Sequence, residues 1–241
     1  MIIIRSNPMP QLKPLALLRQ KTACPIIKCK EALEINGNDY QKALDWLNNN
    51  MAELGAQKLQ KVGSRSMNES LLAYKASQGS SLFVKFDCES DFATRSDHMR
   101  NFAKDLVNSS VNTKSFENLS EEALLESIKE KYHATMLQCV GLLGENMQIT
   151  SAKYFPQGYY SHYLHSSSDN ITGYKLSVCK FSKEIDAKAG NQIAQHVLGF
   201  NPSSIDELLD QQYLFDESIT VRNFLESHST EIIDFHVFIA K

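Results

Sequence analysis

Residues 82–93 read Leu82-Phe83-Val84-Lys85-Phe86-Asp87-Cys88-Glu89-Ser90-Asp91-Phe92-Ala93. The first five residues fit a strand, because the apolar pattern takes a period of two from residue 70 onward. An amphipathic helix starts near Asp97, so 88–93 form a turn between strand and helix. The turn carries Phe92, and a Phe in such a connection usually caps the core from inside. Spacing alone therefore predicts that this ring is buried.

The residues around this stretch predict a mixed fold. The strand at 82–86 pairs with 71–74 as a β-hairpin across a turn at Gly79-Ser80-Ser81. Stripes of apolar residues predict helices over 99–106 and 124–139. The remainder repeats this order, with strands at 152–155, 159–164, 174–179 and 232–239, and helices at 185–197, 204–209 and 220–226. The order indicates two α+β halves of one core built on mostly antiparallel sheet.

The amino-terminal part reads as three short helices over 12–49. Pro14 and Pro25 suit the first turns of helices one and two. Asn36-Gly37-Asn38 ends the second helix, and Asp39 is placed to cap the third. Beyond it, Lys58, Lys61 and Arg65 follow at helical spacing, which predicts a linker helix with a solvated basic face. The predicted division is 1–11 leader or presequence remnant, 12–50 three-helix domain, 51–69 linker helix, 70–145 core subdomain N and 146–241 core subdomain C.

Composition limits the classes of function. The chain has 241 residues with a net charge of -3, so nucleic acid held by phosphate neutralisation is not expected, and the expected partner is a protein. Its five Cys lack CxxC pairs, which argues against a disulfide framework or a zinc ribbon. No apolar run approaches the roughly 20 residues that span a bilayer, so no membrane contact is expected. The opening 1–11 has no acidic residue, as in organellar presequences.

Residues with catalytic or metal-binding potential have structural explanations. No phosphate loop, GxGxxG, HExxH or GxSxG motif is present. His162 and His165 lie near Asp169, but on a strand their rings point to opposite faces, so we expect no metal site. Cys88 lies beside acidic residues that raise a thiol pKa, so we expect a small core residue rather than a nucleophile. We expect no catalytic residue and no cofactor.

Several motifs carry a resemblance to one family along nearly the whole chain. Leu18-Arg19-Gln20-Lys21-Thr22, Cys29-Lys30-Glu31-Ala32-Leu33 and Asn36-Gly37-Asn38-Asp39 resemble the amino-terminal signature of elongation factor Ts. Ser90-Asp91-Phe92 resembles its TDF core motif, and Gly144-Glu145-Asn146-Met147 its GEN[IM] motif. Tyr163-Leu164-His165 is similar to its Tyr-x-His, and Gln212-Tyr213-Leu214-Phe215 to its carboxy-terminal contact segment.

The resemblance implies a fold and a partner. The fold is a small three-helix ubiquitin-associated-like domain followed by a core of two α+β subdomains with mostly antiparallel sheet. The activity is guanine-nucleotide exchange on elongation factor Tu, in its GDP-bound and nucleotide-free forms, without covalent chemistry. Asp91 and Phe92 would insert near the magnesium site of the partner, so that GDP leaves. The positions that match partner contacts are Ser90, Asp91, Phe92, Lys30, Leu143, Gly144, His165, Leu214 and Phe215.

The chain departs from the family pattern in places. Ala23-Cys24-Pro25 replaces a Gly-containing connection, and Ser166 stands where Gly commonly follows the His. Only about a dozen residues separate Gly199 from Tyr213, which leaves no room for the coiled-coil insertion of many bacterial members. We therefore expect a one-to-one heterodimer with elongation factor Tu and no homodimer through a coiled coil. The missing insertion and the acid-free leader favour a mitochondrial matrix member.

Two alternatives remain at this stage. A three-helix domain of this type can stand alone, so a ubiquitin-binding adaptor is possible, although it gives no reason for Ser90-Asp91-Phe92. A Cys/His hydrolase is motivated only by the seven His and five Cys, and reactivity of Cys88 or Cys139 would support it.

Overall fold

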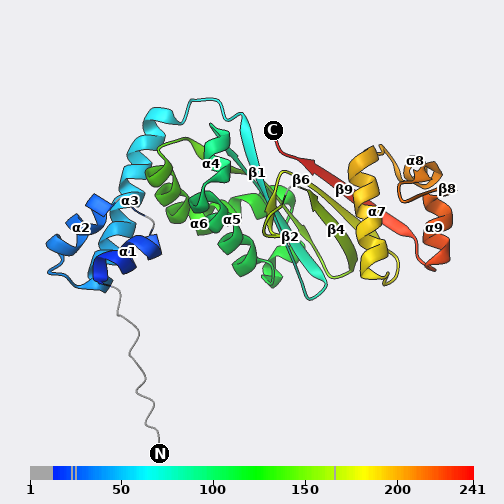
Figure 1. The fold of residues 1–241 in the computed structure, drawn as a ribbon, viewed down its shortest axis with the longest axis horizontal. Coiled ribbons are helices and arrows are strands. Elements are labelled where there is room, and N and C mark those ends of the chain that lie inside the picture. Colours follow the sequence, from blue (N-terminus) through cyan, green and yellow to red (C-terminus); the bar gives the residue numbers. More distant parts are fainter. Residues whose placement is uncertain (1–12, 23, 25, 166) are drawn as a thin grey trace, which may run out of the picture.

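The computed structural model describes residues 13–22, 24, 26–165 and 167–241. The predictions for the leader 1–11, for Pro25 in a first turn, and for departures at Ala23 and Ser166 lie outside the described residues. Figure 1 shows an elongated molecule with three helices at one end, layered sheets in the middle, and α7, α8 and α9 at the other end. The chain runs along this axis and its last strand, β9, returns toward the middle.

The three-helix bundle agrees with the apolar spacing. It consists of α1 (Pro14–Thr22), α2 (Ile26–Ile35) and α3 (Tyr40–Val62). Its core holds Leu18, Cys29, Ala32 and Leu47, all fully buried. The predicted cap is confirmed, because the Asp39 side chain accepts a hydrogen bond from the Lys42 backbone N–H at 3.0 Å. That the bundle is ubiquitin-associated-like stays a prediction.

The linker helix predicted over 51–69 does not exist as a separate element. The helix α3 continues without a break to Val62, and its second half packs along α6 (Glu121–Leu143). Two glycines permit this contact: a Cβ on Gly55 would lie 1.8 Å from the Leu137 carbonyl oxygen, and one on Gly141 would lie 2.3 Å from that of Met51. Because the helix backbones approach so closely, the bundle is fixed directly to the core.

The first sheet has the strand order β3-β2-β1-β5, all antiparallel. Its strands are β1 (Glu69–Ser77), β2 (Ser80–Cys88), β3 (Met147–Phe155) and β5 (Thr172–Gly173). The hairpin turn is at Gln78 and Gly79, with φ of 51° and 85°, rather than at Gly79-Ser80-Ser81. Both angles are positive, as a two-residue hairpin turn of type I′ requires, so Ser80 and Ser81 already belong to the strand.

The second sheet has the order β4-β6-β9 and is also antiparallel. It contains β4 (Tyr159–His165), β6 (Lys175–Phe181) and β9 (Ile232–Ile239). Its outer face is covered by α7 (Ala187–Phe200), α8 (Ile205–Asp210) and α9 (Val221–Ser227). A small hairpin of β7 (Gln212–Tyr213) and β8 (Asp216–Thr220) lies between α8 and α9 in the chain.

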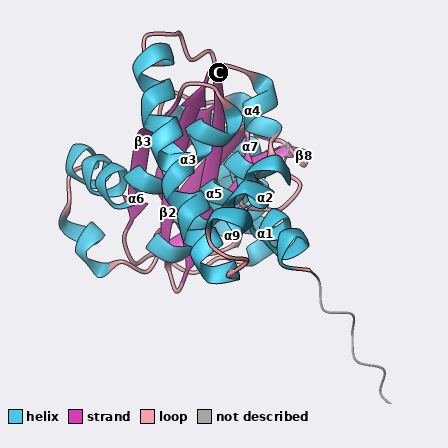
Figure 2. Ribbon diagram, turned by 90° about the vertical axis from the view of Figure 1, so that its left-hand side faces the viewer, coloured by secondary structure: helices cyan, strands magenta, loops and turns pink. Residues whose placement is uncertain are grey.

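The two sheets face each other, so the core has four layers. Phe83 of the first sheet stacks on Phe238 of the second, with ring centroids 3.8 Å apart. The other face of the first sheet packs on α5 (Asp97–Ser110) and α6, and Figure 2 shows the strands enclosed by helices. The short helices α4 (Asp91–Arg95) and η1 (Lys114–Asn118) complete this part. The predicted α+β class with mostly antiparallel sheet is confirmed.

The predicted boundary near residue 145 separates elements that the structure joins. Strand β3, which falls within the predicted subdomain C, pairs with β2 from Met147 to Phe155. Strand β5 likewise joins β1. The first sheet thus includes strands from both predicted subdomains, and the division into 70–145 and 146–241 stays a prediction about the units of the core.

Candidate protein-binding site

Phe92 lies in the first turn of α4 and its side chain is 74% exposed. The burial predicted from spacing alone is therefore wrong. The next two residues, Ala93 and Thr94, occupy the buried positions of this short helix, so Phe92 is directed outward. An exposed phenyl ring costs solvation free energy unless a partner covers it, which marks the 90–92 turn as a candidate contact surface.

Ser90 fixes the start of the short helix. Its Oγ accepts a hydrogen bond from the Ala93 N–H at 3.3 Å, as an N-cap does, and donates to both carboxylate oxygens of Glu145 at 2.8 Å. Asp91 follows, exposed, with its carboxylate 3.2 Å from the Arg95 guanidinium. The hydroxyl of Ser90 thus joins the 90–92 turn to a residue 55 positions later in the chain.

Three connections of the chain meet behind this turn. Glu89 accepts a hydrogen bond from the Asn146 backbone N–H at 2.7 Å and pairs with Arg65 at 3.3 Å. The buried Asn146 amide in turn donates to the backbone carbonyls of Gly63 and Arg65 at 3.4 and 3.3 Å. The segments after α3, after β2 and after α6 are therefore tied together, and they hold the base of α4 in a defined position.

Leu143 and Gly144 lie beside this junction. Gly144 ends α6 in the left-handed conformation with φ of 78°, which favours glycine. A Cβ there would also meet the Lys58 Nζ at 2.5 Å. Leu143 is half-buried and packs against the hydrophobic core between the first sheet and the helices α5 and α6. The structure therefore brings the 143–144 pair and the 90–92 turn together, with Glu145 bonded to Ser90.

His165 ends β4 and is exposed, with its Nδ1 3.0 Å from the Tyr163 hydroxyl. Its carbonyl accepts a hydrogen bond from the Tyr174 N–H at 3.4 Å. The Tyr174 hydroxyl lies 3.3 Å from the Thr94 Oγ1 and accepts from Arg100 at 3.2 Å. His165 is thus connected to α4 through a single residue, Tyr174.

Asp169 holds the start of β5 in place. Its carboxylate accepts hydrogen bonds from the Ile171 and Thr172 backbone N–H groups at 3.0 and 2.7 Å and pairs with Lys104 at 2.8 Å. Burial alone raises the pKa of Asp169, but the Lys104 ammonium and these N–H groups outweigh it and hold the pKa well below its usual range. The 169–172 segment therefore has a charged internal support.

The other predicted contacts lie far from the 90–92 turn. Leu214 and Phe215, 42% and 46% exposed, form the tip between β7 and β8. Lys30 is exposed on α2, with its ammonium 3.6 Å from Glu34. In Figure 1, α2 and β8 lie toward opposite ends of the molecule, with α4 between them. The predicted contact residues occupy three places along the long axis rather than one patch.

His162, His165 and Cys88 do not come together in a metal-binding or catalytic arrangement. The rings of His162 and Tyr74 lie 4.5 Å apart, whereas His165 bonds to Tyr163 on the other face of β4. Burial lowers the pKa of His162. Burial, assisted by Glu145, raises the pKa of Cys88 to about 12, so burial and not its acidic setting is the main cause. Among the described residues, no group of three or more His, Cys, Asp or Glu could hold a metal ion.

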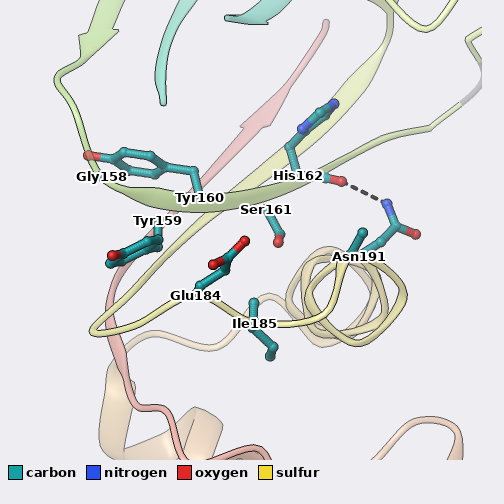
Figure 3. A pocket seen from close by; sticks show the side chains of 9 residues that line it. Gly158, Tyr159, Tyr160, Ser161, His162, Glu184, Ile185 and Asn191 are labelled. Atoms are coloured by element: carbon teal, nitrogen blue, oxygen red, sulfur yellow. Dashed lines mark hydrogen bonds between the residues drawn. The ribbon is translucent and has the colours of Figure 1, made fainter. Parts of the chain in front are cut away.

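A pocket of about 370 Å³ lies between β4 and the start of α7. Figure 3 shows the side chains of Tyr159, Glu184 and Ile185 around it, while the His162 ring is directed away. Asn191 donates a hydrogen bond to the His162 carbonyl at 2.8 Å across its rim. None of the predicted contact residues lines this pocket. Separately, no helix in the described ranges has the length and apolar character to cross a membrane.

Glu89, Arg65, Glu145 and Asn146 were not predicted as site residues. Glu145 and Asn146 do carry a signal, because they belong to the segment that resembles the GEN[IM] motif, whereas Glu89 and Arg65 are polar residues in connections, where polar residues are common. Only the packing of three connections against one another reveals their common role.

Comparison with known proteins gives a consistent family. The model of the family described as "Elongation factor TS" matches residues 89–208. The chain is 28% identical to mitochondrial elongation factor Ts of Mus musculus, over 90% of this chain and 80% of that protein. It is 26% identical to the Homo sapiens protein of the same name, over 90% and 79%, and 28% identical to that of Nematostella vectensis, over 92% and 96%.

Proposed function

Because this chain belongs to the elongation factor Ts family and is a translation elongation factor, we propose that it releases GDP from elongation factor Tu. We place this activity in the mitochondrial matrix, because the relatives are named as mitochondrial proteins. The chain acts as an exchange factor in a one-to-one complex and carries out no covalent chemistry of its own.

The observation that carries the proposal is that the Phe92 ring is exposed on a turn that hydrogen bonds attach to the 145–146 segment. Burial of a Phe side chain contributes about 1.5–3 kcal/mol, and central aromatic anchors can dominate an interface. In the proposed complex, Phe92 enters an apolar site of the partner while Asp91 disturbs the neighbouring magnesium site. The bonds of Ser90 and Glu89 to the 145–146 segment support this role, because a turn that must displace groups in a partner has to resist being pushed back.

The remaining contacts would extend the interface on either side. We propose that Leu143, Gly144 and His165 touch the partner near the 90–92 turn. Lys30 on the helical bundle and Leu214 with Phe215 on the β7–β8 tip would touch it farther away. An adaptor that binds ubiquitin through the three-helix bundle would leave the exposed Phe92 without a role, so we favour the exchange factor.

Nucleotide exchange requires a difference in affinity. The factor must bind nucleotide-free elongation factor Tu better than the GDP-bound form, and by reciprocity GDP with magnesium must weaken its binding.

The test is stopped-flow release of a fluorescent GDP analogue from mitochondrial elongation factor Tu. We expect the chain to accelerate release strongly, and a pull-down to recover the partner without nucleotide but to lose it in excess magnesium and GDP. No acceleration, together with capture of ubiquitin, would replace this proposal by the adaptor.

A further inference from the structure

His196 is a buried histidine with a specific hydrogen bond at each ring nitrogen. It lies on α7 with none of its surface exposed. Its Nδ1 accepts the backbone N–H of Leu214 at 3.2 Å. Its Nε2 lies 2.9 Å from the Gln211 Oε1. The ring therefore joins the side of α7 to both ends of the segment that leads into the β7–β8 tip.

These partners fix the protonation state of the ring. A backbone N–H can only donate, so Nδ1 carries no proton and Nε2 carries the proton that it donates to Gln211. The orientation of the Gln211 amide agrees, because its Nε2 faces the Glu207 carboxylate at 3.5 Å. Burial lowers the pKa of His196, which favours the same neutral form. A protonated ring would place an N–H against the N–H of Leu214.

The ring also supports the exposed aromatic residues around the tip. It stacks on Phe200, with centroids 4.5 Å apart, and lies 6.3 Å from Tyr213. Tyr213 in turn contacts Phe215 at 5.6 Å. Phe200, Leu214 and Phe215 are each at least 42% exposed, so they would be free to reorient without such support.

We propose that His196 is a positioning residue, which holds the Leu214 and Phe215 tip in the geometry that meets the partner by keeping its Nδ1 unprotonated. The proposal rests on the proposed exchange function. Neutral histidine is needed because Nδ1 is the acceptor of the Leu214 N–H, and Leu214 is not among the paired residues of the short β7–β8 hairpin. Protonation of His196 would release the tip and weaken the complex.

Charged groups on the packed elements do not replace this bond. The ring's own hydrogen bonds go to Gln211 and Leu214. Asp210 pairs with Arg222 at 3.0 Å. Besides His196, the titratable or charged groups on α7, α8, β7, β8 and α9 are Lys188, Asp206, Glu207, Asp210, Tyr213, Asp216, Glu217, Arg222 and Glu226.

Two substitutions at this site separate the role of Nδ1 from that of the ring. In His196→Asn the Oδ1 takes the place of Nδ1 and can accept the Leu214 N–H. In His196→Gln the side-chain amide takes the place of Nε2 and leaves Leu214 unpaired. Both variants lose the aromatic stacking equally. His228→Gln, at the C-cap of α9, is a control for a histidine that bonds to neither Gln211 nor Leu214.

Affinity for nucleotide-free elongation factor Tu is measured by calorimetry, beside the melting temperature of each variant. We expect His196→Gln to weaken binding about tenfold, the factor for one lost hydrogen bond, and His196→Asn to stay within about threefold of wild type. Adding His196→Gln to the Leu214→Ala, Phe215→Ala double variant should cause little further loss. Equal losses in the Asn and Gln variants, or full additivity, would overturn the proposal.

Hydrogen exchange of the Leu214 amide in the wild-type chain gives a readout that needs neither a partner nor a variant. We expect protection at neutral pH and its loss as the His196 ring, followed by its nitrogen resonances, becomes protonated. Protection that is independent of ring protonation would overturn the proposal even if exchange activity is established. If the chain does not bind elongation factor Tu at all, the proposed function fails, while this amide still reports on the role of His196.

Discussion

The Ser90 hydroxyl and the Glu145 carboxylate meet at 2.8 Å, and this contact joins the turn that displays Phe92 to the end of α6. The same hydroxyl caps α4 by accepting from Ala93. One side chain therefore sets both the start of the short helix and its attachment to the core. The strongest tests of the candidate site concern this turn and its supports.

Phe92→Ala should leave the fold intact and slow the release of GDP severely. The ring is 74% exposed, so its loss should change the free energy of unfolding by less than about 0.5 kcal/mol. The lost anchor should cost the complex about 2–4 kcal/mol. Stopped-flow exchange and urea unfolding measure the two quantities. Tyr159→Ala, a half-exposed aromatic residue at the β4 pocket, serves as the control and should exchange normally. Normal exchange by Phe92→Ala would rule out the insertion of Phe92 into the partner as the cause of GDP release.

Glu145→Ala should loosen the 90–92 turn. The Ser90 hydroxyl loses its acceptor, so we expect the free energy of unfolding to fall by about 1 kcal/mol and the exchange rate to fall with it. Glu145→Gln keeps an acceptor oxygen and should retain most of both. Urea titration and exchange kinetics on both variants measure the two quantities. If both variants have the stability and the exchange rate of the wild-type chain, the contact between Ser90 and Glu145 is dispensable.

Gly141→Ala should force α3 and α6 apart. Its new methyl would lie 2.3 Å from the Met51 carbonyl oxygen, a backbone atom that cannot move without the helix. We expect a loss of about 1–3 kcal/mol in the free energy of unfolding. Gly199→Ala is the matched control, since nothing lies within 4 Å of its Cβ position, and this helical site should gain up to about 1 kcal/mol. A stable Gly141→Ala variant with unchanged α3 contacts by NMR would contradict the close crossing.

Asp169→Asn should remove part of the pH dependence of stability. The pKa of this carboxyl is depressed in the folded state, so its contribution is present above the unfolded value of about 3.9 and is lost as the pH falls below it. We expect a loss of about 1–3 kcal/mol at pH 7 and a flatter stability profile between about pH 5 and 2. Urea unfolding across this range is the measurement. A stability profile of Asp169→Asn that runs parallel to that of the wild-type chain would refute the assignment.

The thiols should be unreactive in the folded chain. All five are buried, and burial raises the pKa of Cys88 and Cys139 to about 12. At pH 8 only about one in ten thousand of these two groups would be thiolate, the reactive form. Ellman's reagent should therefore label five thiols in urea and label the folded chain slowly. Fast labelling of Cys88 or Cys139 in the folded state would revive the Cys/His hydrolase.

The sequence predicts most elements because each carries its own apolar period. The strand at 232–239 and the helices α5 to α9 follow from local patterns, and so does the Asp39 cap. The unbroken α3 does not follow locally, since it depends on Gly55 fitting against a helix that comes about 80 residues later. The side toward which Phe92 points depends on which neighbours fill the core, and spacing in one short turn does not determine that.

The close crossing of α3 and α6 also sets the reach of the molecule. The helix α3 has 23 residues, which corresponds to about 34 Å. Its first half belongs to the three-helix bundle, and its second half packs on α6. If Lys30 and Phe92 both touch the partner, as proposed, the packing of α3 on α6 fixes the distance between these two contacts. A partner GTPase whose shape changes with its nucleotide would then match both contacts in only one of its shapes, so the fixed distance would itself discriminate between the two states.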